Sequence, residues 1–231
     1  MKKAMPRTAA KSAASKVAAK PRAPAADGKP VAKSRATRGA ERRDTILAAA
    51  LDEFSARGFE ATRLDDVAKR AGIAKGTIYL YFRDKDTLFQ ELVRTMLAPL
   101  IGGIQAMDAA DLPIKQLAER IVDLFVREIY ETRRQDVIRL MIAEGRRFPK
   151  LAEFYYHEVL SRIFDAIRML LKRAAARGEV PGALIEFPQL LAAPGLVAII
   201  WGGMFERYEP LDVRRMLEAH VDLLFAPRRA V

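Results

Sequence analysis

From about Ala40 onward, the apolar residues of the chain follow the spacing of amphipathic α-helices. Between Arg43 and Arg57 they recur at i, i+1, i+4, i+5 and i+8, which predicts a helix with one face against a core. Gly58 can take the left-handed conformation that ends a helix, so this helix is expected to stop there. Its inward residues are Ile46, Leu47, Ala50, Leu51 and Phe54.

Two short helices joined by a turn are predicted next. The first has Thr62 as its N-cap and the acid Asp65 at its third position, and it ends at Ala71–Gly72. The second is expected to run from Lys75 to Phe82. A helix-turn-helix consists of two such helices, and its second helix can enter the major groove of DNA. The residues expected on the inner side of the second helix are Ala74, Ile78 and Phe82.

A fourth helix is predicted from Lys85 to about Ala98, with Asp84 as its N-cap. Pro99 is expected to end or kink it, because proline cannot donate a backbone hydrogen bond. Residues 41–98 are therefore expected to form an N-terminal domain around a three-helix helix-turn-helix unit.

Residues 99–231 are predicted to form a second helical domain. A linker is expected from around Gly102–Gly103 to Pro113, followed by helices near 117–130 and 137–145. The longest helix is predicted from Lys150 to Arg177, with Gly178 as its cap. The fold class expected for the whole chain is all-α.

The segment from Phe187 to Phe205 carries no charge over 19 residues, so a membrane span has to be considered. Prolines and glycines interrupt it, and neither an aromatic belt nor a positive flank frames it. A helix that is apolar on most sides must be buried, and an amphipathic stripe over 211–225 supplies a second apolar face. We therefore expect two packed helices and no membrane contact.

Charge is concentrated at the amino end. The formal net charge of the 231 residues is +11, and residues 1–40 hold eleven Lys and Arg with the single acid Asp27. This basic arm has no aromatic residue and is rich in Ala, Pro and Ser, so it is predicted to be disordered. It is interpreted either as an attractor for nucleic-acid phosphates or as a solubilising leader or a start-codon artefact; an organellar transit peptide is the weaker alternative.

The residue types of the chain exclude several chemistries. It has no cysteine, which removes disulfides, zinc ribbons and thiol nucleophiles. The two histidines, His157 and His220, lie in unrelated contexts and do not suggest a metal or a catalytic triad. We expect no metal, no cofactor and no enzymatic activity; an enzyme on a helical bundle would need converging acid, base or metal-binding residues.

The stretch from Phe59 to Leu88 resembles the DNA-binding domain of the tetracycline-repressor (TetR) family of transcriptional regulators. The resemblance covers about residues 43–92, and its most specific part is Lys-Gly-Thr-Ile-Tyr-x-Tyr-Phe-x-x-Lys over residues 75–85. Ala74 departs from the pattern, because the family often has Ser at this helix cap.

The resemblance implies the residues that contact DNA. The start of the recognition helix would reach base edges and phosphates, Leu80 could meet a thymine methyl, and Lys85 is placed for a phosphate. Thr62 and Arg63, at the start of the preceding helix, would bind the DNA backbone. The full set is Thr62, Arg63, Lys75, Gly76, Thr77, Tyr79, Leu80, Tyr81 and Lys85.

For residues 99–231 the resemblance implies ligand binding and dimerisation. The two C-terminal helices would pack with those of a second copy as a four-helix bundle, through Leu196, Ile199, Ile200, Gly203, Val213, Leu217, Val221 and Leu224. Large adaptable side chains are candidates for a mostly apolar pocket: Phe125, Met141, Phe148, Phe154, Tyr155, Phe164, Met169 and Trp201.

Together these features predict a cytoplasmic, homodimeric regulator that binds a palindromic operator in double-stranded DNA. A repressor released by a small, mostly apolar effector is the expected mode of action. A nucleoid-type protein that works through the basic arm is the alternative of a different class.

Overall fold

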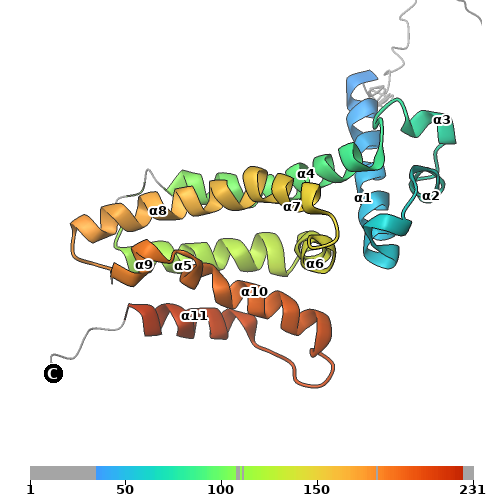
Figure 1. Ribbon diagram of the computed structural model, residues 1–231. Helices are drawn as coiled ribbons and strands as arrows, with labels where there is room; N and C mark the ends of the chain where they lie inside the picture. Colours follow the sequence, from blue (N-terminus) through green and yellow to red (C-terminus); the bar gives the residue numbers. More distant parts are fainter. Residues whose placement is uncertain (1–34, 108–109, 111, 181, 226–231) are drawn as a thin grey trace, which may run out of the picture.

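The computed structural model describes residues 35–107, 110, 112–180 and 182–225, so the predicted basic arm lies outside it except for its last six residues. Every regular element in the described part is helical, which confirms the predicted fold class. Figure 1 shows a small N-terminal part at one end and a longer helical body at the other. The N-terminal part contains α1 (Arg35–Ala61), α2 (Leu64–Arg70), α3 (Lys75–Ile78) and the start of α4 (Lys85–Ala106).

The helical body holds the remaining elements. Their bounds are α5 Ile114–Phe125, the π-helix η2 Val126–Tyr130, α6 Arg134–Glu144, α7 Pro149–Tyr155, the π-helix η3 Tyr156–Leu160, α8 Ser161–Ala176, α9 Gly182–Glu186, α10 Gln189–Met204 and α11 Val213–Leu224. The predicted long helix over 150–177 is therefore a run of α7, η3 and α8, and Gly178 follows it with a φ of 74°.

An aromatic cluster anchors the N-terminal part. Phe54 and Phe59 stack with ring centroids 5.6 Å apart, and the ring of Phe89 on α4 meets both edge-on. Ile78 and Phe82 are fully buried beside this cluster, so they hold α3 against α1 and α4. The predicted inward positions of the recognition helix are correct for these two residues, whereas Ala74 is exposed.

Three helix ends differ from the sequence prediction. α1 begins at Arg35 rather than near Ala40, whereas its backbone leaves the helical conformation at Gly58, at a φ of 77° and a ψ of 172°, so the first run of helix stops where predicted and a kink separates it from residues 59–61. α3 ends at Ile78, and residues 79–81 form a turn. Arg63, not Thr62, is the N-cap of α2.

Thr62 is buried, and its hydroxyl forms hydrogen bonds with backbone carbonyl groups of α1. Its Oγ1 donates to the carbonyl oxygens of Glu53 and Gly58, at 3.2 and 2.8 Å. The hydroxyl therefore ties the end of α1 to the start of α2 and does not cap α2.

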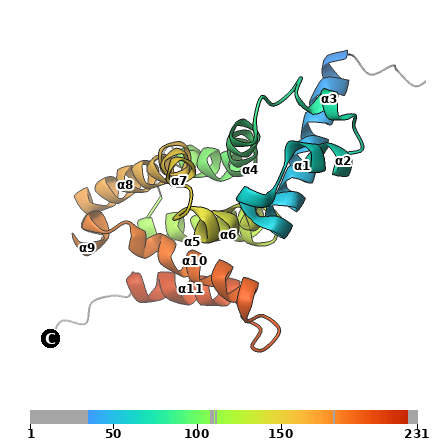
Figure 2. The same ribbon diagram turned by 45° about the vertical axis from the view of Figure 1, so that its right-hand side comes forward.

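α4 continues through Pro99 to Ala106, which corrects both the predicted helix end and the predicted linker. Pro99 removes one backbone hydrogen bond, but Leu97, Leu100 and Ile104 on either side are buried in the body and hold the helix together. One helix therefore spans both parts of the molecule, as Figure 2 shows.

The start of α4 gives a testable pH dependence. The Asp84 carboxylate accepts hydrogen bonds from the hydroxyl and backbone N–H of Thr87, which together with Arg83 lower the pKa of Asp84 to about 2. Since the folded pKa lies below the ordinary value, this stabilisation is present above about pH 4 and is lost as the pH falls toward 2. We expect Asp84→Ala to cost about 1 kcal/mol at pH 7 and much less at pH 2.5, measured by urea unfolding. Equal losses at both pH values would contradict the role of the carboxylate.

None of the helices in the described part of the chain is both long and apolar enough to cross a membrane. The uncharged segment forms α10, which packs against α6 and α11. α11 in turn packs on α5, and these helices bury Ala198 between them.

Candidate DNA-recognition surface and ligand cavity

The recognition helix carries an exposed surface opposite its buried anchors. The side chain of Lys75 is 70% exposed, and Tyr79 and Leu80 are 48% and 83% exposed. A Cβ added at Gly76 would meet nothing within 4 Å, so this backbone also faces open space. Figure 1 places α3 at the outer edge of the N-terminal part, where nothing in the described chain covers it.

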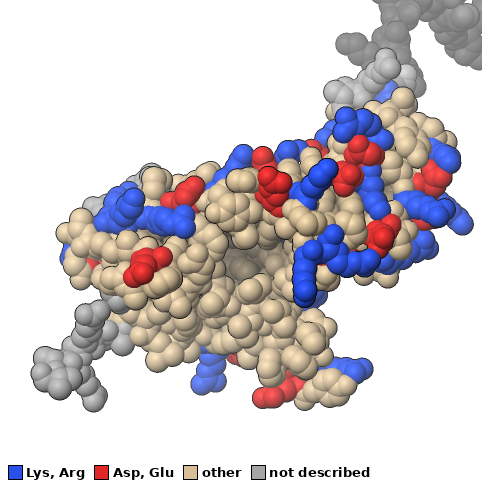
Figure 3. Space-filling model, viewed as in Figure 1, with Lys and Arg blue, Asp and Glu red and all other residues tan. Residues whose placement is uncertain are grey.

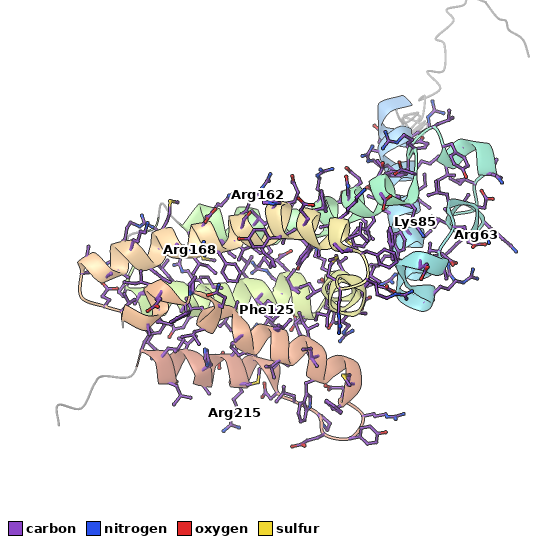
Figure 4. The ribbon with its side chains drawn as sticks, in the orientation of Figure 1. Arg63, Lys85, Phe125, Arg162, Arg168 and Arg215 are labelled. Carbon is purple, nitrogen blue, oxygen red and sulfur yellow. The ribbon has the colours of Figure 1, made fainter. Side chains whose placement is uncertain are left out.

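The other residues predicted to contact DNA have different surroundings. Thr77 is half-buried, and Tyr81 is half-buried against the hydrophobic core. The side chain of Arg63 makes no hydrogen bond or ion pair within the described part of the chain, and it points outward from α2 in Figure 4. Thr62 is buried, and its hydroxyl donates to the carbonyl oxygen of Gly58. Its side chain is therefore not available to contact DNA, which corrects the prediction for this residue.

Lys85 lies beside α1, at the start of α4 (Figure 4). Its Nζ donates to the carbonyl oxygen of Glu60 at 2.8 Å and lies 4.6 Å from the ring centroid of Phe59. These contacts fix the ammonium group near the protein surface and leave donors for a phosphate oxygen.

Asp65 connects the two helices of the helix-turn-helix. Its carboxylate accepts from Nζ of Lys75 at 2.6 Å and from the hydroxyl of Tyr79 at 3.4 Å. The hydrogen bond and the negative charge of Asp65 raise the pKa of Lys75. Sequence reasoning assigned Asp65 only to the first turn of its helix and missed this contact, since it depends on how the turn packs α2 against α3.

A large cavity lies inside the helical body. Its volume is about 730 Å³, within the usual range for small-molecule sites. α4–α8, η3 and α10 contribute most of the wall, and no charged side chain of the described residues lines it. Figure 3 shows a hollow in the middle of the body, rimmed mostly by uncharged atoms, with Lys and Arg gathered on the side nearest the N-terminal part.

The cavity contains half of the predicted pocket residues. Phe125, Met141, Tyr155 and Phe164 line it, and Figure 4 shows Phe125 in the interior of the body. Burial raises the pKa of Tyr155, so its phenol is neutral at physiological pH. The polar side chains of the wall are those of Tyr155, Tyr156 and Gln189.

The other four predicted pocket residues do not line the cavity, which corrects the prediction. Phe148 packs on Phe59, 5.0 Å between centroids, and Phe154 lies under the Arg94 guanidinium. Met169 is exposed on α8. Trp201 packs on Phe205 and donates its indole N–H to a backbone carbonyl oxygen. Most of the wall consists instead of aliphatic side chains, whose type does not distinguish them from an ordinary core.

The mouth of the cavity is apolar. Ile142 of α6, Tyr156 of η3 and Leu196 of α10 line the cavity and are each about half exposed, which places them at its rim. The π-helical turn η3 contributes Tyr156, Val159 and Leu160 to the wall. Turns of this kind occur frequently at functional sites.

α6 connects the cavity with the N-terminal part. It lines the cavity, and its last residue, Glu144, accepts a hydrogen bond from the backbone N–H of Phe59 through Oε1, at 3.3 Å. Two ion pairs flank this contact, Arg147 with Glu60 and Arg133 with Asp52. Figure 2 shows the end of α1 against α6.

The residues predicted for a dimer interface separate into two groups. Ile199, Val213, Leu217 and Val221 are buried within one chain, against α5 and neighbouring helices, so they are not available to a partner. Leu196, Ile200 and Gly203 are exposed, and Leu224 is half-buried. The prediction is therefore wrong for the first group.

An uncovered apolar strip runs along α10. It consists of Leu190, Val197, Ile200 and Met204, all exposed, and Leu223 of α11 is exposed as well. The spacing of the α10 residues places them on one side of the helix. The glycines do not contribute to this strip: Gly202 lies against Tyr130 and Gly203 against Arg139 of the same chain.

The histidines have ordinary surroundings. The ring of His157 is exposed and meets Tyr156, and Nε2 of His220 lies 2.9 Å from the carbonyl oxygen of Leu190. In the described ranges, no group of three or more His, Asp or Glu side chains could hold a metal ion.

An exposed helix-turn-helix joined to a helical body is the architecture of a class of DNA-binding regulators, and the apolar cavity in this body has the size of a small-molecule site. Two family models match the chain: "Bacterial regulatory proteins, tetR family" over residues 46–92 and "Tetracyclin repressor-like, C-terminal domain" over residues 117–224. The chain belongs to the TetR family of helix-turn-helix transcriptional regulators.

Among the relatives of this chain are a transcriptional repressor and a transcriptional regulator. The transcriptional repressor KstR2 of Mycolicibacterium smegmatis is 32% identical over 53% of this chain and 59% of its own length. The regulator AcrR of Shigella flexneri is 24% identical over 80% of this chain and 87% of its own.

Two solved structures extend the similarity to the fold. A TetR-family regulator from Mesorhizobium loti has a TM-score of 0.60 at 26% identity and covers 82% of this chain and 98% of its own. FadR from Bacillus subtilis in complex with stearoyl-CoA has a TM-score of 0.63 at 18% identity and covers 79% of this chain and 97% of its own. At this identity the similarity supports a shared fold and nothing further.

Proposed function

We propose that this protein is a homodimeric transcriptional repressor that leaves its DNA operator when a mostly apolar ligand fills the cavity. The observation that carries the proposal is the position of α6, which lines the cavity and bonds the N-terminal part through Glu144. A DNA-binding role would keep the protein with the DNA, in the cytoplasm.

The DNA-reading surface consists of Lys75, Gly76, Thr77, Tyr79 and Leu80. Arg63, Tyr81 and Lys85 flank it, and the two basic residues are suited to phosphates. Because the recognition helix is held by Ile78 and Phe82, its exposed side chains would enter a major groove as a fixed set.

The apolar strip of α10, together with Leu223, is proposed to bind the same strip of a second copy. A two-fold dimer would present two recognition helices to two half-sites, which explains why a palindromic operator is expected. Of the residues first predicted for this interface, Ile200 belongs to the strip, and Leu196 and Leu224 remain proposed contacts beside it, whereas Gly203 lies against Arg139 of its own chain.

The ligand proposed for the cavity is a long or bulky hydrocarbon with any charged group outside. A carboxylate inside would have no cation to pair with, since no charged side chain lines the wall. An acyl-CoA meets this requirement with its chain inside and its phosphates at the mouth, and stearoyl-CoA, present in the FadR structure, is the first compound to test. A ligand releases DNA only if it binds the DNA-incompetent arrangement more tightly, and α6 and α4 are the rigid connectors to the N-terminal part.

Selection of duplexes from a random-sequence pool tests the DNA-binding role. Tyr79→Ala is expected to weaken binding to the selected site by about 1–3 kcal/mol and binding to random DNA much less, because a base contact discriminates between sequences. Tyr208→Ala, which removes an exposed tyrosine between α10 and α11 that lies outside the cavity wall, is the control. A pool that yields no preferred sequence would favour the nucleoid-type alternative, and equal losses on both DNAs would reject Tyr79 as a reading residue.

A further inference from the structure

Asp65 is an acid on a surface proposed to face a polyanion. Its side chain is 41% exposed, and both oxygens are directed at the recognition helix, where they bond Lys75 and Tyr79. These two partners are themselves proposed to read DNA. An acid in this position occupies the polar groups that the DNA would otherwise bind.

The stability of the domain does not explain this arrangement. Exposed ion pairs such as that of Asp65 with Lys75 contribute little to folding. The first turn of α2 already has a second acid, Asp66, which interacts with the positive helix end and pairs with Arg57 of α1 at 3.2 Å. The contact of Asp65 with the recognition helix is therefore better explained by a role in DNA binding than by a role in stability.

We propose that Asp65 is a specificity-determining residue that lowers affinity for non-cognate DNA by holding Lys75 and Tyr79, an inference that rests on the proposed DNA-binding function. On an arbitrary sequence, Lys75 stays with Asp65 and releases no counterion from the DNA, while the carboxylate repels nearby phosphates. On a cognate site, a base acceptor such as guanine O6 or N7 replaces Asp65 as the partner of Lys75. The bond that Lys75 loses to Asp65 is then replaced by a bond to a base only at the correct sequence. This raises the ratio of the affinity for cognate DNA to the affinity for random DNA.

The test compares Asp65→Asn with Asp66→Asn in the full chain. Both variants remove one negative charge from neighbouring positions of α2, but only the first frees Lys75. Dissociation constants are measured at several salt concentrations on the duplex selected by the unmodified protein and on random duplex. Asp65→Asn is expected to tighten random-DNA binding about fivefold or more, with a salt slope steeper by about one unit, and to change the selected site much less.

Two further variants separate charge from structure. Asp65→Glu keeps the carboxylate and is expected to restore most of the specificity ratio. Lys75→Gln is expected to weaken the selected site more than random DNA, and it tests the same pair if Asp65→Asn melts below the assay temperature. Asp66→Asn should leave the ratio within about twofold of the unmodified protein.

The proposal is overturned if Asp65→Asn leaves random-DNA binding unchanged, or if both asparagine variants shift it equally, which would show an effect of net charge alone. Failure of the unmodified protein to select any sequence would instead reject the proposed function, and this inference with it.

Discussion

Replacing Val197 by glutamate is expected to split the dimer and to abolish tight binding to a palindromic site. Val197 is 50% exposed in the middle of the apolar strip of α10, so a partner covering that strip would bury the new carboxylate without a cation. Such a buried charge costs several kcal/mol, which exceeds a typical margin between dimer and monomer at micromolar concentration. Sedimentation velocity reports the mass, and titration of the selected duplex reports the loss of binding.

Met169→Glu is the control for this prediction. Met169 is 51% exposed on α8, away from α10 and α11, so the same change of residue type should leave the mass and the DNA affinity unchanged. Ala198, next to Val197, would be a poor choice because it is fully buried within one chain. A Val197→Glu protein that remains dimeric and still binds the palindrome would place the interface on another face.

Filling the cavity is expected to abolish the ligand response without weakening DNA binding. Ile163 of α8 lines the cavity and is only half-buried, so Ile163→Trp can extend its ring into the empty volume. If stearoyl-CoA lowers the operator affinity of the unmodified protein about 10- to 100-fold, the variant should show less than about a threefold effect. Its affinity for the operator without ligand should be unchanged, because the substitution lies far from the recognition helix.

Met169→Trp, on the same helix but outside the cavity wall, should retain the full response. Thermal shift with acyl-CoA of increasing chain length separates binding from release. Stabilisation that grows with chain length supports an acyl chain in the cavity. An unmodified protein that binds no compound of this series, or binds it without any change in operator affinity, would reject the acyl-CoA proposal or the coupling respectively.

Local patterns were sufficient for the N-terminal part. The period of Ile46, Leu47, Ala50, Leu51 and Phe54 defines one helix face, and all five residues are buried. The motif over residues 75–85 identifies the recognition helix because its anchors and exposed positions alternate within one short segment. Asp84 is the N-cap of α4 as predicted, since capping depends on residues only three positions apart.

Contacts between distant segments were beyond the reach of these patterns. Thr62 has the residue type of an N-cap, but the packing of α2 on α1 brings its hydroxyl to Gly58. Pro99 has the residue type of a helix end, but burial of Leu97 and Leu100 carries α4 past it.

In the C-terminal body, too, sequence patterns predicted the helices but not the contacts between distant segments. Its sequence determined that this part of the chain is helical, that α10 is apolar and α11 amphipathic, and that many large side chains are present. Only the tertiary structure decided that Val213, Leu217 and Val221 face α5 while Val197 and Ile200 face outward, and that Phe125 lines a cavity while Phe148 packs on Phe59. The physical reason is that periodicity reports which side of a helix avoids water, and burial in a core, against a ligand or against a second copy satisfies that requirement equally well.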